Sequence, residues 1–166
     1  FISHAHADQK LVEALVSQLD KVFARGLNIF ASSIRGIQPG EDWFENIERK
    51  LNAANIFIVL VSPVSKDKNW VWFELGAFWS RAKDSNSEEG LLFPLLVDLK
   101  PSDLSRPIGD LQAISLNDDE QLSSFFNLLI ERLGFGNHDL LDLELIADNI
   151  PEYDNEQIII PSYTSP

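Results

Sequence analysis

A glutamate stands among tryptophans in the segment 69–79, which reads Asn-Trp-Val-Trp-Phe-Glu-Leu-Gly-Ala-Phe-Trp. Apolar residues recur at helical spacing from Val71 onward and predict that this segment opens a helix. Trp70 stands one turn before Glu74, where the two side chains can touch. A carboxylate flanked by indole rings is partly desolvated, which strengthens its attraction for a developing positive charge. Glu74 is therefore a candidate catalytic carboxylate; the simpler interpretation is a helix-start acid that favours the helix dipole while its tip reaches water.

Two histidines separated by one residue, His4 and His6, have a spacing that metal sites can use. The third histidine of the chain is His138, in its acidic C-terminal part, so a metal would need carboxylates from elsewhere. We therefore expect no metal site, and we expect His4 and His6 to lie in a loop that faces a ligand or solvent.

Three serines could suggest a nucleophile: Ser3, Ser62 and Ser65. None lies in a Gly-x-Ser-x-Gly turn, so we expect serines that satisfy backbone groups at strand ends. The sequence also lacks a glycine-rich phosphate motif, which argues against a nucleoside triphosphatase and against a dinucleotide-dependent dehydrogenase.

The charge of the chain is strongly negative and unevenly distributed. The 166 residues carry a formal net charge of −13, and residues 137–166 contain acids but no lysine or arginine. Neither part offers the basic surface that a phosphate backbone needs, so we expect no direct nucleic-acid partner. No apolar run is long enough to cross a membrane, and there is no cysteine for a disulfide scaffold. We predict a domain over residues 1–136 and an acidic tail, or linker to another domain, over residues 137–166.

Strands and helices are expected to alternate along the first 136 residues. We predict strands over residues 1–3, 27–31, 56–61, 91–97 and 113–116, the first being the end of a strand whose beginning is missing. A first helix should take Asp8 as its N-cap and stop at Gly26, and a second should begin at Glu41 and Asp42. The last helix should begin after Asp118 and run to Leu133, with Gly134 ending it. Pro94 requires a bulge or an edge position in its strand.

This alternation predicts an α/β fold, a flavodoxin-like three-layer sandwich with a five-stranded parallel sheet in the order 2-1-3-4-5. Such sheets bind ligands beyond the carboxyl ends of their strands, at the switch point between strands 1 and 3. Three segments should converge there: Ser3 to His6, Ser32 to Gly40, and Ser62 to Glu74.

Four motifs in register resemble the Toll/interleukin-1 receptor (TIR) domain over residues 1 to about 134. They are Phe-Ile-Ser-His at residues 1–4, Ile-Gln-Pro-Gly-Glu-Asp-Trp at 37–43, Ile-Val-Leu-Val-Ser-Pro at 58–63, and Trp-Val-Trp-Phe-Glu-Leu at 70–75. The Phe-Glu-Leu-Gly-Ala form is similar to that of bacterial TIR domains.

The resemblance implies an activity, because many TIR domains cleave NAD⁺ to nicotinamide and a linear or cyclic ADP-ribose. It puts the catalytic glutamate at Glu74 and the partner ring at Trp70. The other substrate-binding residues that it implies are Ser3, His4, Ser33, Gly40 and Trp43. Two departures from the family pattern concern the ligand contacts: this chain reads Ala-Ser-Ser at 31–33, where the family often has Asp, and His-Ala-His at 4–6, where some active members carry Tyr or Arg.

The resemblance also implies how such a domain works in the cell. NAD⁺ would be the substrate, with no cofactor, and the 32–40 loop would mediate self-association that helps to complete the site. We expect a cytoplasmic effector of bacterial antiphage defence, activated by oligomerisation and coupled to a sensor domain in the same chain or in a partner protein. Two alternatives remain open: a non-catalytic TIR scaffold that signals by homotypic contacts, and an N-glycosidic enzyme similar to nucleoside deoxyribosyltransferases.

Overall fold

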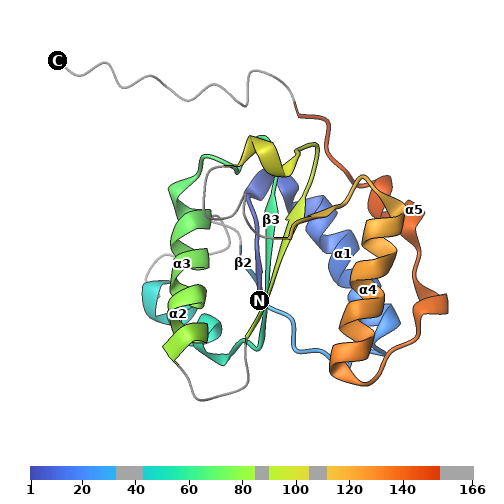
Figure 1. The fold of residues 1–166 in the computed structure, drawn as a ribbon, viewed down its shortest axis with the longest axis horizontal. Coiled ribbons are helices and arrows are strands. Elements are labelled where there is room, and N and C mark those ends of the chain that lie inside the picture. Colours follow the sequence, from blue (N-terminus) through green and yellow to red (C-terminus); the bar gives the residue numbers. More distant parts are fainter. Residues whose placement is uncertain (33–42, 85–89, 105–111, 154–166) are drawn as a thin grey trace.

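The computed structural model describes residues 1–32, 43–84, 90–104 and 112–153, and within these ranges only the backbone of Ser32, Trp43, Phe44, Trp70 and residues 81–84. Five parallel strands form its central sheet, in the order β2-β1-β3-β4-β5 (Figure 1). They are β1 (Ile2–Ser3), β2 (Ala31–Ser32), β3 (Ile56–Val61), β4 (Leu91–Leu96) and β5 (Ile114–Ser115). The predicted α/β fold with a parallel sheet is confirmed.

Helices cover both faces of the sheet (Figure 1). On one face lie α1 (Gln9–Val22), α4 (Asp119–Leu133) and α5 (Leu143–Ala147); on the other lie α2 (Trp43–Ala53) and α3 (Asn69–Asp84). Short 3-10 helices span His6–Asp8, Pro101–Asp103 and His138–Leu140. Within the described residues, no helix is long and apolar enough to span a membrane.

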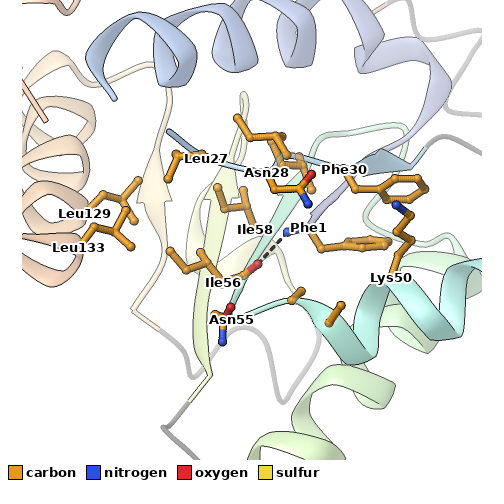
Figure 2. A pocket seen from close by; sticks show the side chains of 14 residues that line it. Phe1, Leu27, Asn28, Phe30, Lys50, Asn55, Ile56, Ile58, Leu129 and Leu133 are labelled. Atoms are coloured by element: carbon orange, nitrogen blue, oxygen red, sulfur yellow. Dashed lines mark hydrogen bonds between the residues drawn. The ribbon is translucent and has the colours of Figure 1, made fainter. Parts of the chain in front are cut away.

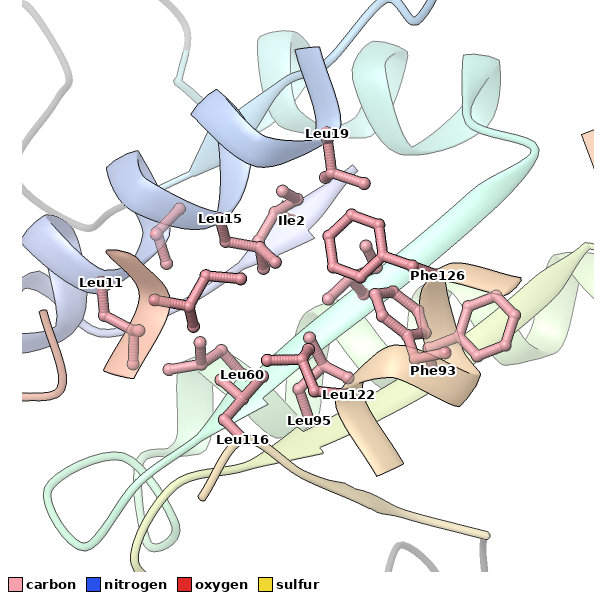
Figure 3. Packing of buried hydrophobic residues seen from close by; sticks show 14 of the residues in the cluster. Ile2, Leu11, Leu15, Leu19, Leu60, Phe93, Leu95, Leu116, Leu122 and Phe126 are labelled. Carbon is pink, nitrogen blue, oxygen red and sulfur yellow. The ribbon is translucent and has the colours of Figure 1, made fainter. Parts of the chain in front are cut away.

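The larger hydrophobic core lies between the sheet and the helices α1 and α4 (Figure 3). The leucine stripe of α1 meets Ile2 and Leu60 of the sheet there, and Phe125 packs edge-on against Phe93, their ring centroids 5.3 Å apart. The second core lies between the sheet and the helices α2 and α3, where Phe78 stacks on Phe57. Buried aromatic pairs of this kind contribute about 1 kcal/mol beyond their area.

The ends of α4 follow the expected capping chemistry. The carboxylate of Asp118 accepts hydrogen bonds from the N–H groups of Glu120 and Gln121, and Gly134 takes the left-handed conformation that ends the helix (φ +74°).

The ends of α1 differ from the prediction. Asp8 occupies the N-cap position, but its side chain makes no capping hydrogen bond, because the carboxylate is buried in other contacts described below. The helix also ends before Gly26, through Ala24 and Arg25 with φ of 48° and 58°.

One strand prediction needs correction, and at Pro94 the structure distinguishes between the two predicted options. The sequence predicts the second strand over 27–31, whereas among the described residues β2 is Ala31–Ser32, the two residues that pair with β1. In β4, the register with β3 runs without a break over residues 91–96, so the bulge expected at Pro94 is absent from this pair. The second predicted option, an edge-type position, agrees with the structure. β5 pairs with β4 only at Leu95 and Leu96, so Pro94 has no partner residue in β5.

Residues 137–153, expected as the start of a tail or linker, pack against the domain. Ile146 is 0 % exposed and belongs to the core that α1 and α4 share, and Tyr153 packs at its margin. The prediction that the domain stops at residue 136 is therefore wrong in terms of packing, since the apolar residues of the following segment complete this face. The 32–40 loop beyond Ser32 and the acids at 41–42 lie outside the described residues, as do residues 154–166.

Candidate functional site

Glu74 lies in α3, the helix that follows the central strand β3. Its apolar neighbours Val71, Leu75 and Phe78 turn the same helix face toward the sheet, and all three are buried. The side chain of Glu74 is 0 % exposed, so the simpler interpretation, an acid whose tip reaches water, is wrong. A carboxylate in such a place needs hydrogen-bond donors, because burial of an unpaired charge is costly.

Ser3 supplies one donor to this carboxylate. Its hydroxyl donates a hydrogen bond to Oε2 of Glu74, and Ser3 is itself 0 % exposed. Because Ser3 is the last residue of β1, the contact lies at the carboxyl ends of the strands, next to the point where the chain order of the sheet reverses. The sequence prediction of both residues at one site is consistent with this geometry.

His4, the next residue, is buried rather than solvated. Its side chain is 3 % exposed, and among the described residues its Nδ1 has no hydrogen-bond partner. Burial lowers the pKa of His4 to about 4, so the ring is neutral at pH 7. The expectation of a solvated position is therefore wrong, and the expectation that His4 faces a ligand stays a prediction.

The structure describes the remaining predicted residues only in part. Trp70 lies in α3 one turn before Glu74 and Trp43 is the first residue of α2, both placed by their backbone alone. Ser33 and Gly40 lie outside the described residues.

A second buried carboxylate, Asp8, is not among the site residues predicted from the sequence. It is 0 % exposed; its Oδ2 accepts a hydrogen bond from Ser62 Oγ (2.8 Å) and its Oδ1 one from Tyr153 Oη (2.8 Å). Burial raises the pKa of Asp8, and burial together with the Asp8 carboxylate raises the pKa of the Tyr153 hydroxyl. No local sequence pattern indicates this pairing, because 145 residues separate Asp8 from Tyr153.

The serines after β3 hold the turn that leads into α3. Ser65 Oγ accepts from the N–H of Ser62 (2.8 Å), as expected of a serine that satisfies a strand end. The N–H groups of Ser65 and Lys66 both donate to the carbonyl of Ser62 at 3.0 Å, and Trp72 Nε1 donates to the carbonyl of Lys66. Ser62 differs from the expectation, because its hydroxyl bonds the side chain of Asp8.

A cavity of about 360 Å³ lies at the opposite edge of the sheet, where the strands begin (Figure 2). Its lining is mainly apolar, with Lys50, Asn28 and Asn55 as the polar side chains, and no carboxylate lines it among the described residues. The amino group of Phe1 donates to the carbonyl of Ile56 beside it (2.8 Å). Within the described part of the chain, this cavity therefore has no counterpart to Glu74.

No group of three or more histidine, aspartate or glutamate side chains in the described part of the chain is placed to hold a metal ion. The described side chains of the site are carboxylates and hydroxyls: Glu74 of α3 with Ser3 at the end of β1, and Asp8 with Ser62 after β3.

Comparison with known families agrees with the fold. Residues 1–130 match the family model of the TIR domain, and the chain belongs to that family. No curated protein matches the chain. The matched region includes both Ser3 and Glu74 and ends before the segment that carries Tyr153.

Proposed function

We propose that this TIR domain cleaves the bond between nicotinamide and ribose in NAD⁺, with Glu74 as the catalytic carboxylate. The observation that carries the proposal is a carboxylate held at the carboxyl ends of β1 and β3, withdrawn from water and bonded to the Ser3 hydroxyl. The TIR family includes NAD⁺-cleaving enzymes, which makes this the leading activity to test.

A single acid is sufficient for this reaction. Nicotinamide carries a positive charge in NAD⁺ and leaves as a neutral molecule, so no second carboxylic acid is needed to protonate it. Positive charge develops on the ribose, and a carboxylate beside the ribose hydroxyls stabilises it, more strongly where water is excluded. Groups of this sort contribute about 3–5 kcal/mol, or a factor of about 10²–10⁴ in rate. Trp70 would stack on the ligand, and His4, Ser33, Gly40 and Trp43 would complete its binding.

Substrate must gain access to this carboxylate. Because Glu74 is 0 % exposed, NAD⁺ reaches it only after a neighbouring segment has moved. We propose further that activity depends on self-association through the 32–40 loop, which would help to complete the site. A bacterial antiphage effector in the cytoplasm, triggered through a sensor domain or partner, is the setting that we propose for such a switch.

The direct experiment compares Glu74→Gln with the wild type under conditions in which the wild type is concentrated or assembled. Free nicotinamide is measured by chromatography. We expect the variant to lose about 10²-fold or more in turnover, since Gln keeps the shape but not the charge. Glu131→Gln is the matched control, because Glu131 is exposed on α4, on the other face of the sheet. Equal turnover by Glu74→Gln and the wild type would reject the proposal.

One observation favours a second function, a non-catalytic scaffold that assembles by homotypic contacts. The complete burial of Glu74 and its bond to Ser3 are also what a purely structural acid would show. If assembled wild-type protein releases no nicotinamide from NAD⁺ while it still self-associates, the scaffold is the better description.

A further inference from the structure

Three segments that are distant in sequence meet on the carboxylate of Asp8. They are the loop after β1, which carries Asp8 itself, the turn after β3, which carries Ser62, and the C-terminal segment, which carries Tyr153. Asp8 and Ser62 are 0 % exposed, and Tyr153 is half-buried.

Two hydrogen bonds join the C-terminal segment to α1 before it reaches Asp8. The N–H of Asn137 donates to the carbonyl of Val22 (2.9 Å), and the N–H of Asp142 donates to Oε1 of Gln18 (2.9 Å). After α5 the chain turns toward the edge at which the strands end (Figure 1), where Tyr153 reaches Asp8. The segment thus runs beside α1 and returns over the carboxyl ends of the strands.

The same two loops also hold Glu74. The loop after β1 begins at Ser3, whose hydroxyl bonds Glu74, and the turn after β3 leads directly into α3. The Asp8–Ser62 bond therefore closes a ring of contacts: from Glu74 to Ser3, along the loop to Asp8, across to Ser62, and through the turn back to α3.

Because the Asp8 carboxylate is buried, the order of this ring depends on the hydroxyls of Ser62 and Tyr153 that donate to it. Besides a backbone hydrogen bond from Ala5, Asp8 accepts one side-chain hydroxyl on each oxygen, so loss of either hydroxyl weakens the hydrogen bonding of a carboxylate in a dry environment. We expect the loop after β1 and the turn after β3 to rearrange, or to admit water, when one of these hydrogen bonds is lost.

We propose that Tyr153 is a positioning residue for the Glu74 site, acting through Asp8 and Ser62, so that the C-terminal segment controls the order of the two loops that hold the catalytic carboxylate. This inference rests on the proposed NAD⁺ cleavage for its effect on rate, but its effect on loop order is independent of that reaction. Tyr153 lies outside residues 1–130, the region that the family model matches, so the proposal does not follow from the family match.

The test compares Tyr153→Phe, which removes only the hydroxyl, with Ser123→Ala. Ser123 on α4 also bonds the C-terminal segment by a hydroxyl, through His138 Nε2 at 2.9 Å, whereas the side-chain partners of Asp8 among the described residues are Ser62 and Tyr153. Nicotinamide release is measured against NAD⁺ concentration, and hydrogen exchange is measured for the amides of Ser65 and Lys66.

For Tyr153→Phe we expect kcat to fall about five- to tenfold with KM within about twofold, and exchange in the turn after β3 to accelerate by a similar factor. For Ser123→Ala we expect kcat and the exchange rate in the turn after β3 to stay within about twofold of the wild type. Equal effects of the two variants, or unchanged exchange in Tyr153→Phe, would overturn the proposal. If the wild type cleaves no NAD⁺, the proposed function fails, and the exchange comparison alone decides the role of Tyr153.

Discussion

Ser3 and Glu74, 71 residues apart, are joined by a hydrogen bond from the serine hydroxyl to the glutamate carboxylate, with both side chains withdrawn from solvent. The contact joins the end of β1 to the helix after β3, which are neighbours only because β1 and β3 pair in parallel. The polar pair therefore depends on the sheet, and it occurs at the edge where α/β sheets bind their ligands.

Removal of the Ser3 hydroxyl should damage both stability and rate. In Ser3→Ala the carboxylate of Glu74 loses a charge-assisted donor, so we expect a loss of about 1.5–3 kcal/mol in the free energy of unfolding and about tenfold in kcat for NAD⁺ cleavage. Urea denaturation and nicotinamide release measure the two effects. The control is Ser80→Ala, at an exposed position of α3, the helix that carries Glu74. It should change the unfolding free energy by less than about 0.5 kcal/mol. Wild-type stability in Ser3→Ala would show that the hydrogen bond contributes nothing.

The buried ring of His4 should make stability depend on pH. Its pKa is about 4 in the folded state and about 6.5 when unfolded, so between these values the unfolded chain binds the extra proton. The stability that neutral His4 provides is present above pH 6.5 and is lost as the pH falls toward 4. Compared with His4→Gln, the wild type should lose about 2 kcal/mol of unfolding free energy between pH 7.5 and pH 5.

The measurement is urea denaturation of both proteins at the two pH values. His6→Gln, at an exposed position two residues away, is the matched control for loss of an imidazole. A difference between wild type and His4→Gln that is the same at both pH values would contradict the burial of His4 in solution.

The parts of the fold that were predicted correctly are determined by residues that are close together in the sequence. The unbroken apolar run of β3 indicated a strand covered on both faces, and the spacing of Val71, Leu75 and Phe78 indicated the buried face of α3. Asp118 and Gly134 define α4 because capping involves residues only a few positions apart.

The parts that were wrong or missed depend on contacts between distant segments. Asp8 has the sequence features of an N-cap, yet its carboxylate bonds Ser62 and Tyr153, and no local pattern indicates either partner. The C-terminal segment is acidic on average, which suggested a linker, whereas Ile146 is buried in the core and other apolar residues of the segment pack against it. Average composition carries little information about a short segment in which one face is apolar.

The packing of the C-terminal segment can be tested with two neighbouring residues. Ile146→Ala should lower the unfolding free energy by about 2–4 kcal/mol, because Ile146 is 0 % exposed and the change leaves a cavity. Leu145→Ala should cost less than about 1 kcal/mol, since that side chain is 37 % exposed. Urea denaturation of both variants measures the difference. Two equally small effects would mean that residues 137–153 do not belong to the folded domain in solution.

Substitution by alanine should change the melting temperature in opposite directions at two glycines, Gly134 and Gly76. Gly134 ends α4 with φ of +74°, a conformation that costs an alanine about 1 kcal/mol, so Gly134→Ala should lower the melting temperature by about 3 °C. Gly76 lies inside α3, and apart from its own helix backbone no atom of the described residues lies within 4 Å of the place where a Cβ would stand; a helical glycine is about 0.5–1 kcal/mol less favourable than alanine. Gly76→Ala should therefore raise the melting temperature by about 2 °C, as measured by thermal unfolding. If it lowered the melting temperature instead, close packing of another segment at this exposed position, two residues from Glu74, would be the explanation to pursue.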